Sequence, residues 1–427
     1  MQKIRVVADF DWLDKEEEVG ILGYDSLRGT SVYTFEFDKA WLKKYSGIML
    51  GGDLQPFTGI QYNKERNQIF GTFSDSLPDR WGRRLIDLRV NTSLKEHGQS
   101  VKKLSDWDYI MGVEDKLRMG AFRFKELSSD NYICYQPDSS VPPVMYLDDL
   151  MQAAGEIEKS EYRHLEPEER WIQRLFQPGS SMGGARPKAC VQDNGTLYVA
   201  KFPSFKDDVN VARWEHFAHL MALECGINAA ETKVVSSKDG RDIFLSKRFD
   251  RTEDGRRIHM ASSLSLLGLN DGDGERSGKG YLDIVDFIIS NGGGNVDNDL
   301  EELYRRVAFN ICIGNTDDHF RNHAFLLGKD GWKLSPAYDM NPTLKYSQAL
   351  MIDDCSNDSN LDILYESHEA YMLGERTART IITDVTRNFK YWESTARKLQ
   401  LPKSEMDVFR GRFEDGMQWK YGGGIRR

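Results

Sequence analysis

The chain has 427 residues, of which 40% are hydrophobic, and a formal net charge of −10 at pH 7. This length predicts two or three domains with hydrophobic cores, and the negative charge argues against broad, nonspecific nucleic-acid binding by this chain alone. The five cysteines are scattered without a CxxC pair, which is typical of reduced thiols and excludes a disulfide framework. The first residues are too polar for a signal peptide and no long apolar run occurs, so we expect a cytoplasmic protein without a membrane span.

The first part of the chain predicts short strands followed by a helix. Apolar and polar side chains alternate in three strand-like segments: Ile4–Ala8, Val19–Tyr24 and Tyr33–Phe37. The segment Asp79–Arg89 then places Trp81, Leu85 and Leu88 at helical spacing. A polar region with Pro137 and Pro142-Pro143 follows, and we place a domain boundary near residue 140.

The middle of the chain mixes helices and strands. The expected elements are a helix at Asp148–Lys159, strands at Lys188–Gln192 and Thr196–Phe202, a helix at Val209–Cys225 and a strand at Ile243–Phe249. The turn Asp193-Asn194-Gly195 joins the first two strands, and Asn-Gly is the strongest short signal for a hairpin. Gly226 is placed to end the helix before it.

The remainder is mainly helical. The clearest segments are Gly280–Ser290 and Leu300–Ile313, joined by a glycine-rich connection at Asn291–Asn295 that we expect to be flexible. In the second helix one face carries the apolar side chains of Leu300, Leu303, Val307 and Ile311, with Glu302 and Arg306 opposite.

One polar stretch, residues 314–322, carries the strongest functional signal. It places Asp317 five residues before Asn322, and Asp339 follows in Ala337-Tyr338-Asp339. Protein kinases use this spacing for a catalytic Asp that takes the substrate proton, an Asn that holds Mg²⁺, and a second Asp at the metal. A turn or helix cap would explain Asp317 and Asp318 equally well if they stood alone.

Three further features supply what such a site would need. The small-residue loop Pro178–Pro187 could cradle phosphates with its backbone amides, although it matches no Walker motif and an ordinary surface loop is the alternative. Lys201, on the strand after it, could reach phosphates or lie at the solvent rim. Glu215, on the next helix, could pair with Lys201 or be exposed. We interpret His319 as a residue that organises its loop.

With these residues in order, the chain resembles the HipA-type serine/threonine kinases, the toxin components of bacterial toxin–antitoxin pairs. The resemblance runs through Phe73–Leu85, Ser180–Ala189, Ala200–Pro203, Lys247–Arg251, Asn315–Asn322 and Ala337–Asp339. It implies an α+β, two-lobed, protein-kinase-like fold with a small N-terminal β-rich subdomain and a mainly helical C-terminal lobe. The implied domains are residues 1–140, 141–250 and 251–427.

The resemblance also implies roles for individual residues. Asp317 would be the catalytic base, Lys201 would bind phosphate, and Asn322 and Asp339 would bind Mg²⁺. The implied ATP-binding residues are Ser181, Met182, Gly183, Gly184, Ala185, Lys188, Lys201, Glu215, Lys247, Phe249, His319, Asn322 and Asp339. Ser181, or Ser180 beside it, would be autophosphorylated and so switch the kinase off. Asp318 stands where other members carry Gly, and Arg186-Pro187 where others have a polar, acidic pair.

The family implies partners as well. These are a protein substrate with Ser or Thr, which could be an aminoacyl-tRNA synthetase, and a HipB-like helix-turn-helix antitoxin dimer through which most DNA contact would be made. Two other functions stay open from the sequence. One is a kinase-fold corepressor that mainly strengthens the antitoxin on operator DNA, and the other is a small-molecule or lipid kinase.

Overall fold

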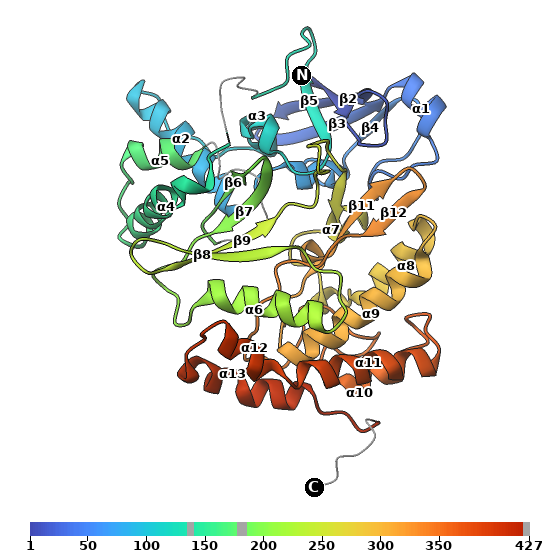
Figure 1. The fold of residues 1–427 in the computed structure, drawn as a ribbon. Coiled ribbons are helices and arrows are strands. Elements are labelled where there is room, and N and C mark those ends of the chain that lie inside the picture. Colours follow the sequence, from blue (N-terminus) through green and yellow to red (C-terminus); the bar gives the residue numbers. More distant parts are fainter. Residues whose placement is uncertain (135–140, 177–185, 422–427) are drawn as a thin grey trace. The chain divides into compact units, whose positions relative to one another are not determined.

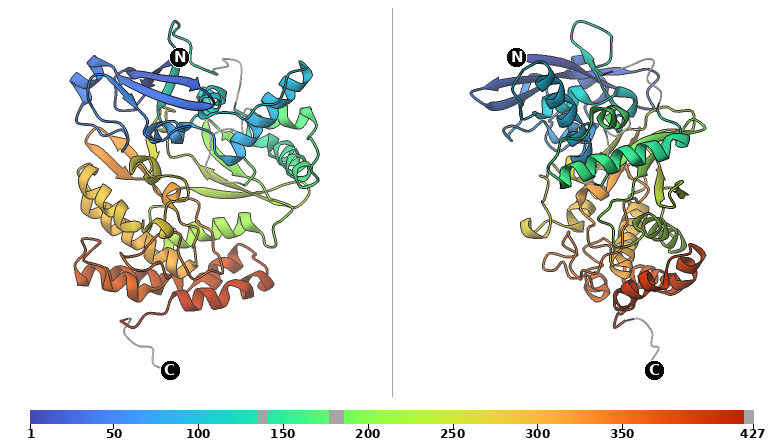
Figure 2. Two further views of the ribbon diagram at one scale, coloured as in Figure 1. Left: turned by 180° about the vertical axis from the view of Figure 1, so that it is seen from behind. Right: turned by 90° about the vertical axis from the view of Figure 1, so that its left-hand side faces the viewer.

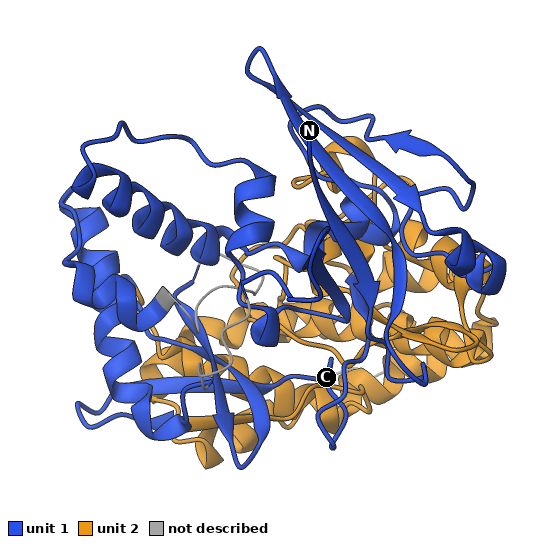
Figure 3. Ribbon diagram, turned by 90° about the horizontal axis from the view of Figure 1, so that it is seen from above, with its two compact units in different colours: residues 1–206, 235–261, 265–269 blue, residues 207–234, 262–264, 270–427 orange. Residues whose placement is uncertain are grey.

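The computed structural model describes residues 1–134, 141–176 and 186–421. Its chain divides into two compact units (Figure 3). Unit 1 contains residues 1–206, 235–261 and 265–269, and unit 2 contains residues 207–234, 262–264 and 270–427. The three domains expected from the sequence stay a prediction.

Unit 1 begins with a five-stranded antiparallel sheet in the order β4-β3-β2-β1-β5, drawn mainly in blue in Figure 1. Its strands are β1 (Gln2–Ala8), β2 (Glu17–Leu27), β3 (Thr30–Phe37), β4 (Ile60–Tyr62) and β5 (Phe122–Glu126). The three strands expected from alternation are confirmed. The β2–β3 turn places Arg28 and Gly29 at φ values of 53° and 80°, which matches the twist of a two-residue hairpin.

The helices of unit 1 come next in the chain. They are α1 (Lys39–Tyr45), α2 (Arg80–Glu96), α3 (Asp106–Gly112), α4 (Leu147–Tyr162) and α5 (Glu169–Phe176), with short 3₁₀ turns at Gly71–Ser76, Asp115–Leu117 and Val144–Tyr146. The helix expected from Asp79 is confirmed and extends to Glu96. It starts after Asp79 because that side chain accepts a hydrogen bond from the Gly82 amide at 2.6 Å and caps the helix.

A second, four-stranded sheet has the order β6-β7-β9-β8. Its strands are β6 (Lys188–Asp193), β7 (Thr196–Lys201), β8 (Thr232–Ser236) and β9 (Asp242–Lys247). Asn194 and Gly195 have φ values of 49° and 84°, as the predicted two-residue turn requires, so the expected hairpin is confirmed. Each residue from Lys188 to Asp193 therefore has a fixed partner in β7.

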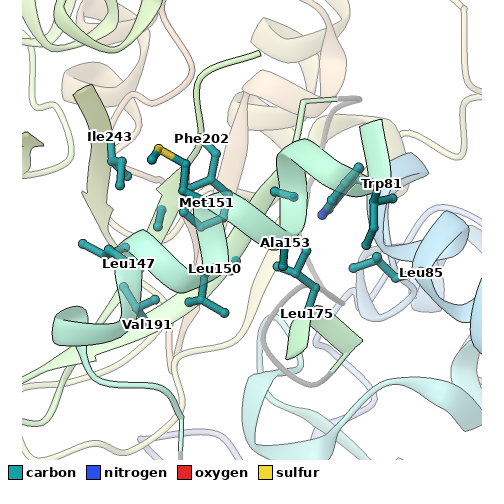
Figure 4. Close-up of a cluster of buried hydrophobic side chains, with 14 of the residues drawn as sticks. Trp81, Leu85, Leu147, Leu150, Met151, Ala153, Leu175, Val191, Phe202 and Ile243 are labelled. Carbon is teal, nitrogen blue, oxygen red and sulfur yellow. The ribbon is translucent and has the colours of Figure 1, made fainter. Parts of the chain in front are cut away.

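The core of this part of unit 1 joins the sheet to helices α2, α4 and α5 (Figure 4). Trp81 and Leu85 come from α2, Leu150 from α4 and Leu175 from α5, and they pack with Val191 of β6. Burying one such leucine contributes about 2 kcal/mol, so a cluster of this size can hold α2 against the hairpin.

Unit 2 is mainly helical, as expected. Its elements are α6 (Val211–Glu224), α8 (Tyr281–Asn291), α9 (Val296–Ile313), β11 (Ala324–Gly328), β12 (Gly331–Leu334), α10 (Leu361–Glu366), α11 (Glu375–Phe389), α12 (Trp392–Lys398) and α13 (Lys403–Gly416), with 3₁₀ turns at Glu275–Ser277 and Phe320–Asn322. Strands β8 and β10 (Met260–Ser262) and helix α7 (Ser263–Leu266) each include residues of both units. No helix in the described part of the chain is long and apolar enough to cross a membrane.

Helix α9 is the centre of unit 2. It packs against α8 and β12 and against α10, α11 and α13, the red and orange-red helices of Figures 1 and 2. The predicted apolar face is buried, but Arg306 on the opposite face is also only 3% exposed. Its guanidinium donates to Glu302 at 2.8 Å and to the Ser335 carbonyl at 2.6 Å. The polar face of α9 therefore also binds the segment that follows β12.

The glycine-rich connection before α9 is hydrogen-bonded, although the sequence suggested a flexible link. The Gly293 amide donates to the Trp332 carbonyl at 2.8 Å. A Cβ at Gly293 would lie 3.0 Å from the backbone of Asp330 and Gly331, so glycine here allows close approach of two backbones.

Candidate active site

The polar stretch 314–322 begins where α9 ends. Gly314 has φ of 72° and forms the left-handed C-cap of the helix. A Cβ at this position would lie 2.8 Å from the Thr343 carbonyl oxygen, so both conformation and space require glycine. The chain then leaves α9 in a direction fixed by hydrogen bonds of Asn315 to Asn310 and of Thr316 to Thr343.

The hairpin β11–β12 brings the two ends of the candidate site together. Phe325 pairs with Leu334, and the Ser335 amide donates to the Ala324 carbonyl at 2.9 Å. The segment that ends at Asn322 lies just before this hairpin, and Asp339 lies just after it. The Tyr338 hydroxyl donates to the Arg321 carbonyl, which ties the two segments to each other.

Asp339 has an unusual backbone. Its φ of 56° lies in the left-handed region, which non-glycine residues seldom occupy. The residue is half-buried, and its carboxylate accepts a hydrogen bond from Nδ2 of the Asn341 side chain at 3.2 Å. Local strain of this kind often occurs at functional sites, so the observation is consistent with the predicted metal-binding role.

The adjacent aspartates 317 and 318 lie in opposite environments. Asp317 is exposed, whereas Asp318 is 4% exposed. One oxygen of Asp318, Oδ2, accepts three hydrogen bonds: from the Tyr281 hydroxyl at 2.7 Å, from Asn310 Nδ2 at 2.8 Å and from His323 Nε2 at 2.7 Å. The reading of this pair as a simple cap or turn therefore fails for Asp318, which is a buried acceptor.

The charges in this cluster follow from its surroundings. Burial opposes ionisation of Asp318, but His323 and the hydrogen bonds from His323 and Tyr281 outweigh it, so the pKa of this carboxyl lies below its ordinary value. Burial and the neighbouring Asp318 raise the pKa of Tyr281 well above its ordinary value, so the phenol stays a donor. Because a carboxylate only accepts, Nε2 of His323 carries the proton.

Asn322 is 8% exposed, and its side chain is oriented by the loop itself. Its Nδ2 donates to the Asp317 carbonyl at 3.2 Å, and its backbone amide donates to the His319 carbonyl at 2.8 Å. With the nitrogen engaged, the side-chain oxygen is the atom that would bind a cation. His319 is half-buried, and its Nδ1 has no hydrogen-bond partner among the described residues.

The donor atoms of Asn322 and Asp339 fit magnesium and do not fit zinc. One carboxylate and one amide oxygen are hard ligands, and Mg²⁺ uses few protein ligands because it keeps several waters and binds substrate phosphates. Within residues 1–134, 141–176 and 186–421, no group of three or more His, Cys, Asp or Glu could hold a metal.

Two lysines of the predicted ATP site, Lys201 and Lys188, lie on the hairpin β6–β7 of unit 1. Lys201 is half-buried at the end of β7, with its Nζ 5.6 Å from the centre of the Phe244 ring. Lys188 lies directly opposite Lys201 in the ladder, but it is 2% exposed and pairs with Asp79 at 3.0 Å. Arg186 Nε donates to the Phe202 carbonyl at 3.0 Å, which fixes the chain just before β6 to the end of β7.

The remaining predicted site residues are placed as follows. Glu215, on α6 in unit 2, is 2% exposed, so it is not an ordinary surface glutamate. Its pairing with Lys201, which belongs to unit 1, stays a prediction. Lys247 and Phe249 are half-buried near the end of β9, and Lys247 Nζ lies 3.1 Å from Glu253. Ser180, Ser181, Met182, Gly183, Gly184 and Ala185 lie outside the described residues.

Sequence reasoning missed the partners of the buried charges. These are Asp79 for Lys188, and Tyr281, Asn310 and His323 for Asp318. Asn310 gave a usable signal, because it is an amide in the apolar end of α9. Asp79 was expected only as the start of a helix.

Comparisons with known proteins agree with the order of these motifs. Residues 12–104 match the model described as HipA N-terminal domain, and residues 180–392 match the HipA-like C-terminal domain. Two curated relatives carry the names "Putative kinase", from Haemophilus influenzae, and "Putative kinase Y4mE", from Sinorhizobium fredii. They are 26% and 25% identical over 44% and 35% of this chain. The matches span 61% and 35% of the relatives' own lengths, less than two thirds in both cases.

A solved structure shares the fold. That structure is described as the complex of HipA, HipB and operator DNA from the Shewanella oneidensis MR-1 toxin–antitoxin system. The two chains superpose with a TM-score of 0.65 and share 18% sequence identity, and the match covers 94% of each chain. The expected α+β class is confirmed and the structure shows antiparallel sheets, whereas the two-lobed arrangement stays a prediction. Both matched domains and the shared fold lead to one conclusion: the chain belongs to the HipA-type family.

Proposed function

We propose that this chain is an ATP- and Mg²⁺-dependent serine/threonine protein kinase that acts as a HipA-like toxin. The observation that carries the proposal is the hairpin β11–β12, whose open end adjoins the segments with Asn322 and Asp339, while Asp317 stays exposed on the first of them. Family membership and the names of the curated relatives support phosphoryl transfer.

The chemistry assigns one task to each residue. The Asp317 carboxylate accepts the proton of a substrate hydroxyl while the hydroxyl oxygen bonds to the γ-phosphorus and the bond to the ADP oxygen breaks. Lys201 neutralises phosphate charge, and Asn322 and Asp339 hold Mg²⁺ through oxygen atoms. When bound, Mg²⁺ supplies positive charge beside the phosphates. The buried Glu215 would orient Lys201, and Lys247, Phe249 and His319 would lie along the nucleotide.

The proposal extends to regulation and partners. Phosphorylation of Ser181 or Ser180 would place a dianion in the phosphate loop and repel ATP. A HipB-like antitoxin dimer is the proposed partner, since the structural match is described in a complex of HipA with HipB and operator DNA. The formal charge of −10 favours DNA contact made mainly through that partner.

The same match supports a second candidate function, a corepressor that tightens the antitoxin on its operator. Titrating operator DNA with the antitoxin, in the presence and absence of this chain, measures that role. An Asp317→Ala chain that strengthens operator binding as much as the wild type would show that the corepressor role needs no phosphoryl transfer.

The kinase proposal is tested by phosphate transfer from γ-labelled ATP. Asp317→Ala should lower the rate by about 10²–10⁴-fold, the usual contribution of a general base, while calorimetry finds ATP binding nearly unchanged. Asp330→Ala is the matched control, because this exposed aspartate lies in the turn at the other end of the same hairpin. Wild-type rates in Asp317→Ala would overturn the assignment.

A further inference from the structure

A buried hydrogen-bond cluster adjoins the exposed Asp317, and the proposed catalytic roles do not use it. We call Tyr281, Asn310, Asp318 and His323 the Asp318 cluster. All four residues are at most 4% exposed. They come from the first turn of α8, from α9, from the polar stretch and from the residue before β11.

The cluster fixes both ends of one short segment. Asp318 and His323 are joined through Oδ2 and Nε2, and the residues between them include Asn322. The Ser263 amide and hydroxyl both donate to the His323 carbonyl at 2.7 Å, so His323 is held on its backbone side as well. Asn310 holds Asp318 through Nδ2 and Asn315 through Oδ1, which anchors the part before Asp317 to α9.

The cluster leaves the neighbouring groups facing outward. Asp318 is drawn inside by three donors, and the adjacent Asp317 is exposed. Within the closed segment, the Asp317 carbonyl accepts from Asn322 Nδ2, so the two proposed active residues are also tied to each other. A shift of Asp318 would therefore move the proposed base and the proposed metal ligand together.

Burying the Asp318 carboxylate in a core costs free energy of desolvation. Removing a charge from water costs several kcal/mol, and apolar residues often replace buried charges without loss of stability. A carboxylate here does supply one acceptor on which donors from α8, from α9 and from the far end of its own segment converge, and that convergence defines the loop geometry.

We infer that Asp318 is a positioning residue that holds Asp317 and Asn322 in the geometry for transfer. This inference rests on the proposed kinase function for its consequence, and on the hydrogen bonds alone for its structural part. Asp318 touches neither substrate nor metal; it acts through the segment that carries Asp317 and Asn322.

Two tyrosines provide a matched test. Tyr281→Phe removes one donor to Asp318, whereas Tyr304→Phe removes the hydroxyl that donates to the Leu364 carbonyl at 2.9 Å. Both residues are 0% exposed and both lie on helices of unit 2. We therefore expect a similar decrease in Tm for both variants, which separates loss of stability from loss of positioning.

The first readout is amide hydrogen exchange of the nucleotide-free protein, followed by mass spectrometry of a peptide covering residues 314–323. Tyr281→Phe should exchange this peptide at least about threefold faster than the wild type, because the segment loses a tether, and Tyr304→Phe should not. Equal protection in the two variants would overturn the inference, whether or not the chain proves to be a kinase.

The second readout is the Mg²⁺ concentration for half-maximal phosphate transfer, which does not change when a fraction of the protein is merely unfolded. Tyr281→Phe and Asp318→Ala should raise it by about threefold or more, with Asp318→Asn closer to the wild type because an amide oxygen can still accept. Unchanged Mg²⁺ dependence in both Tyr281→Phe and Asp318→Ala would contradict the inference while leaving the kinase function intact. A wild-type chain without transfer would refute the proposed function, and the exchange result would still decide whether Asp318 positions the segment.

Discussion

Two antiparallel hairpins have charged residues of the proposed site on or next to them, and the charges of the two sets are opposite. In unit 1, β6–β7 aligns Lys188 with Lys201 across the ladder. In unit 2, β11–β12 has the acidic stretch before it and Asp339 after it. Each region contains one buried, paired charge, Lys188 or Asp318, and a less buried charge of the same sign beside it, Lys201 or Asp317.

The difference between the regions lies in how the buried charge is held. Lys188 pairs with the carboxylate of Asp79, which is also the N-cap of α2, and its backbone carbonyl accepts from Trp81 Nε1 of the same helix at 3.1 Å. Asp318 instead receives three donors, from Tyr281 of α8, Asn310 of α9 and His323 at the far end of its own segment. We conclude that the ladder already fixes the position of Lys188, whereas Asp318 lies in a loop whose position is fixed by hydrogen bonds to its side chain.

The largest expected effect is on the rate of phosphate transfer and comes from Asp339, the half-buried aspartate after β12. Asp339→Ala removes the carboxylate proposed to bind Mg²⁺ and should lower phosphate transfer by about 10³-fold, because transition-state charge is then poorly neutralised. Initial rates at saturating ATP measure this, with Asp330→Ala as the control. Activity within threefold of the wild type would remove Asp339 from the site.

A smaller effect should come from the buried pair of unit 1. Asp79→Ala removes the carboxylate that pairs with the buried Lys188 and also removes a helix cap, so the free energy of unfolding should fall by about 3–5 kcal/mol. Urea unfolding measures the loss. Asp38→Ala is the matched control, since Asp38 caps α1 by accepting from the Ala40 and Trp41 amides, and should cost about 1 kcal/mol. Equal losses would mean that the Lys188 pair adds nothing beyond capping.

The turns, the helix ends and the spacing of the site residues could be predicted from short stretches of sequence, whereas the partners of the buried charges could not. Asn194-Gly195 indicates a turn and Gly314 indicates a helix end, because these residue types readily adopt the positive φ values that both structures need. The spacing of Asp317 and Asn322 can likewise be read directly from the sequence. The Asp79–Lys188 pair joins residues 109 positions apart, and Tyr281 meets Asp318 across 37 positions, so only the packed fold brings them together.

The smallest expected effect is a pH dependence in unit 1. Burial opposes ionisation of Asp250, but Arg248 and Arg251 outweigh it and hold the pKa of this carboxyl below its ordinary value. Its stabilisation is therefore complete above the unfolded-state pKa of about 4 and is lost as the pH falls through the lower folded-state value. Urea unfolding between pH 7 and pH 3 should show a decline confined to the acid end, shallower in Asp250→Asn. An equally steep decline in that variant would assign the acid sensitivity to other carboxylates.

The most direct test of the central claim compares two adjacent residues in one assay. Asp317→Asn and Asp318→Asn are each measured for phosphate transfer from ATP and for Tm. We predict that Asp317→Asn loses transfer by at least about 10²-fold with little change in Tm, because an exposed base is lost. Asp318→Asn should lower Tm and keep a larger share of the activity. The opposite result, full activity in Asp317→Asn and none in a folded Asp318→Asn, would contradict the account.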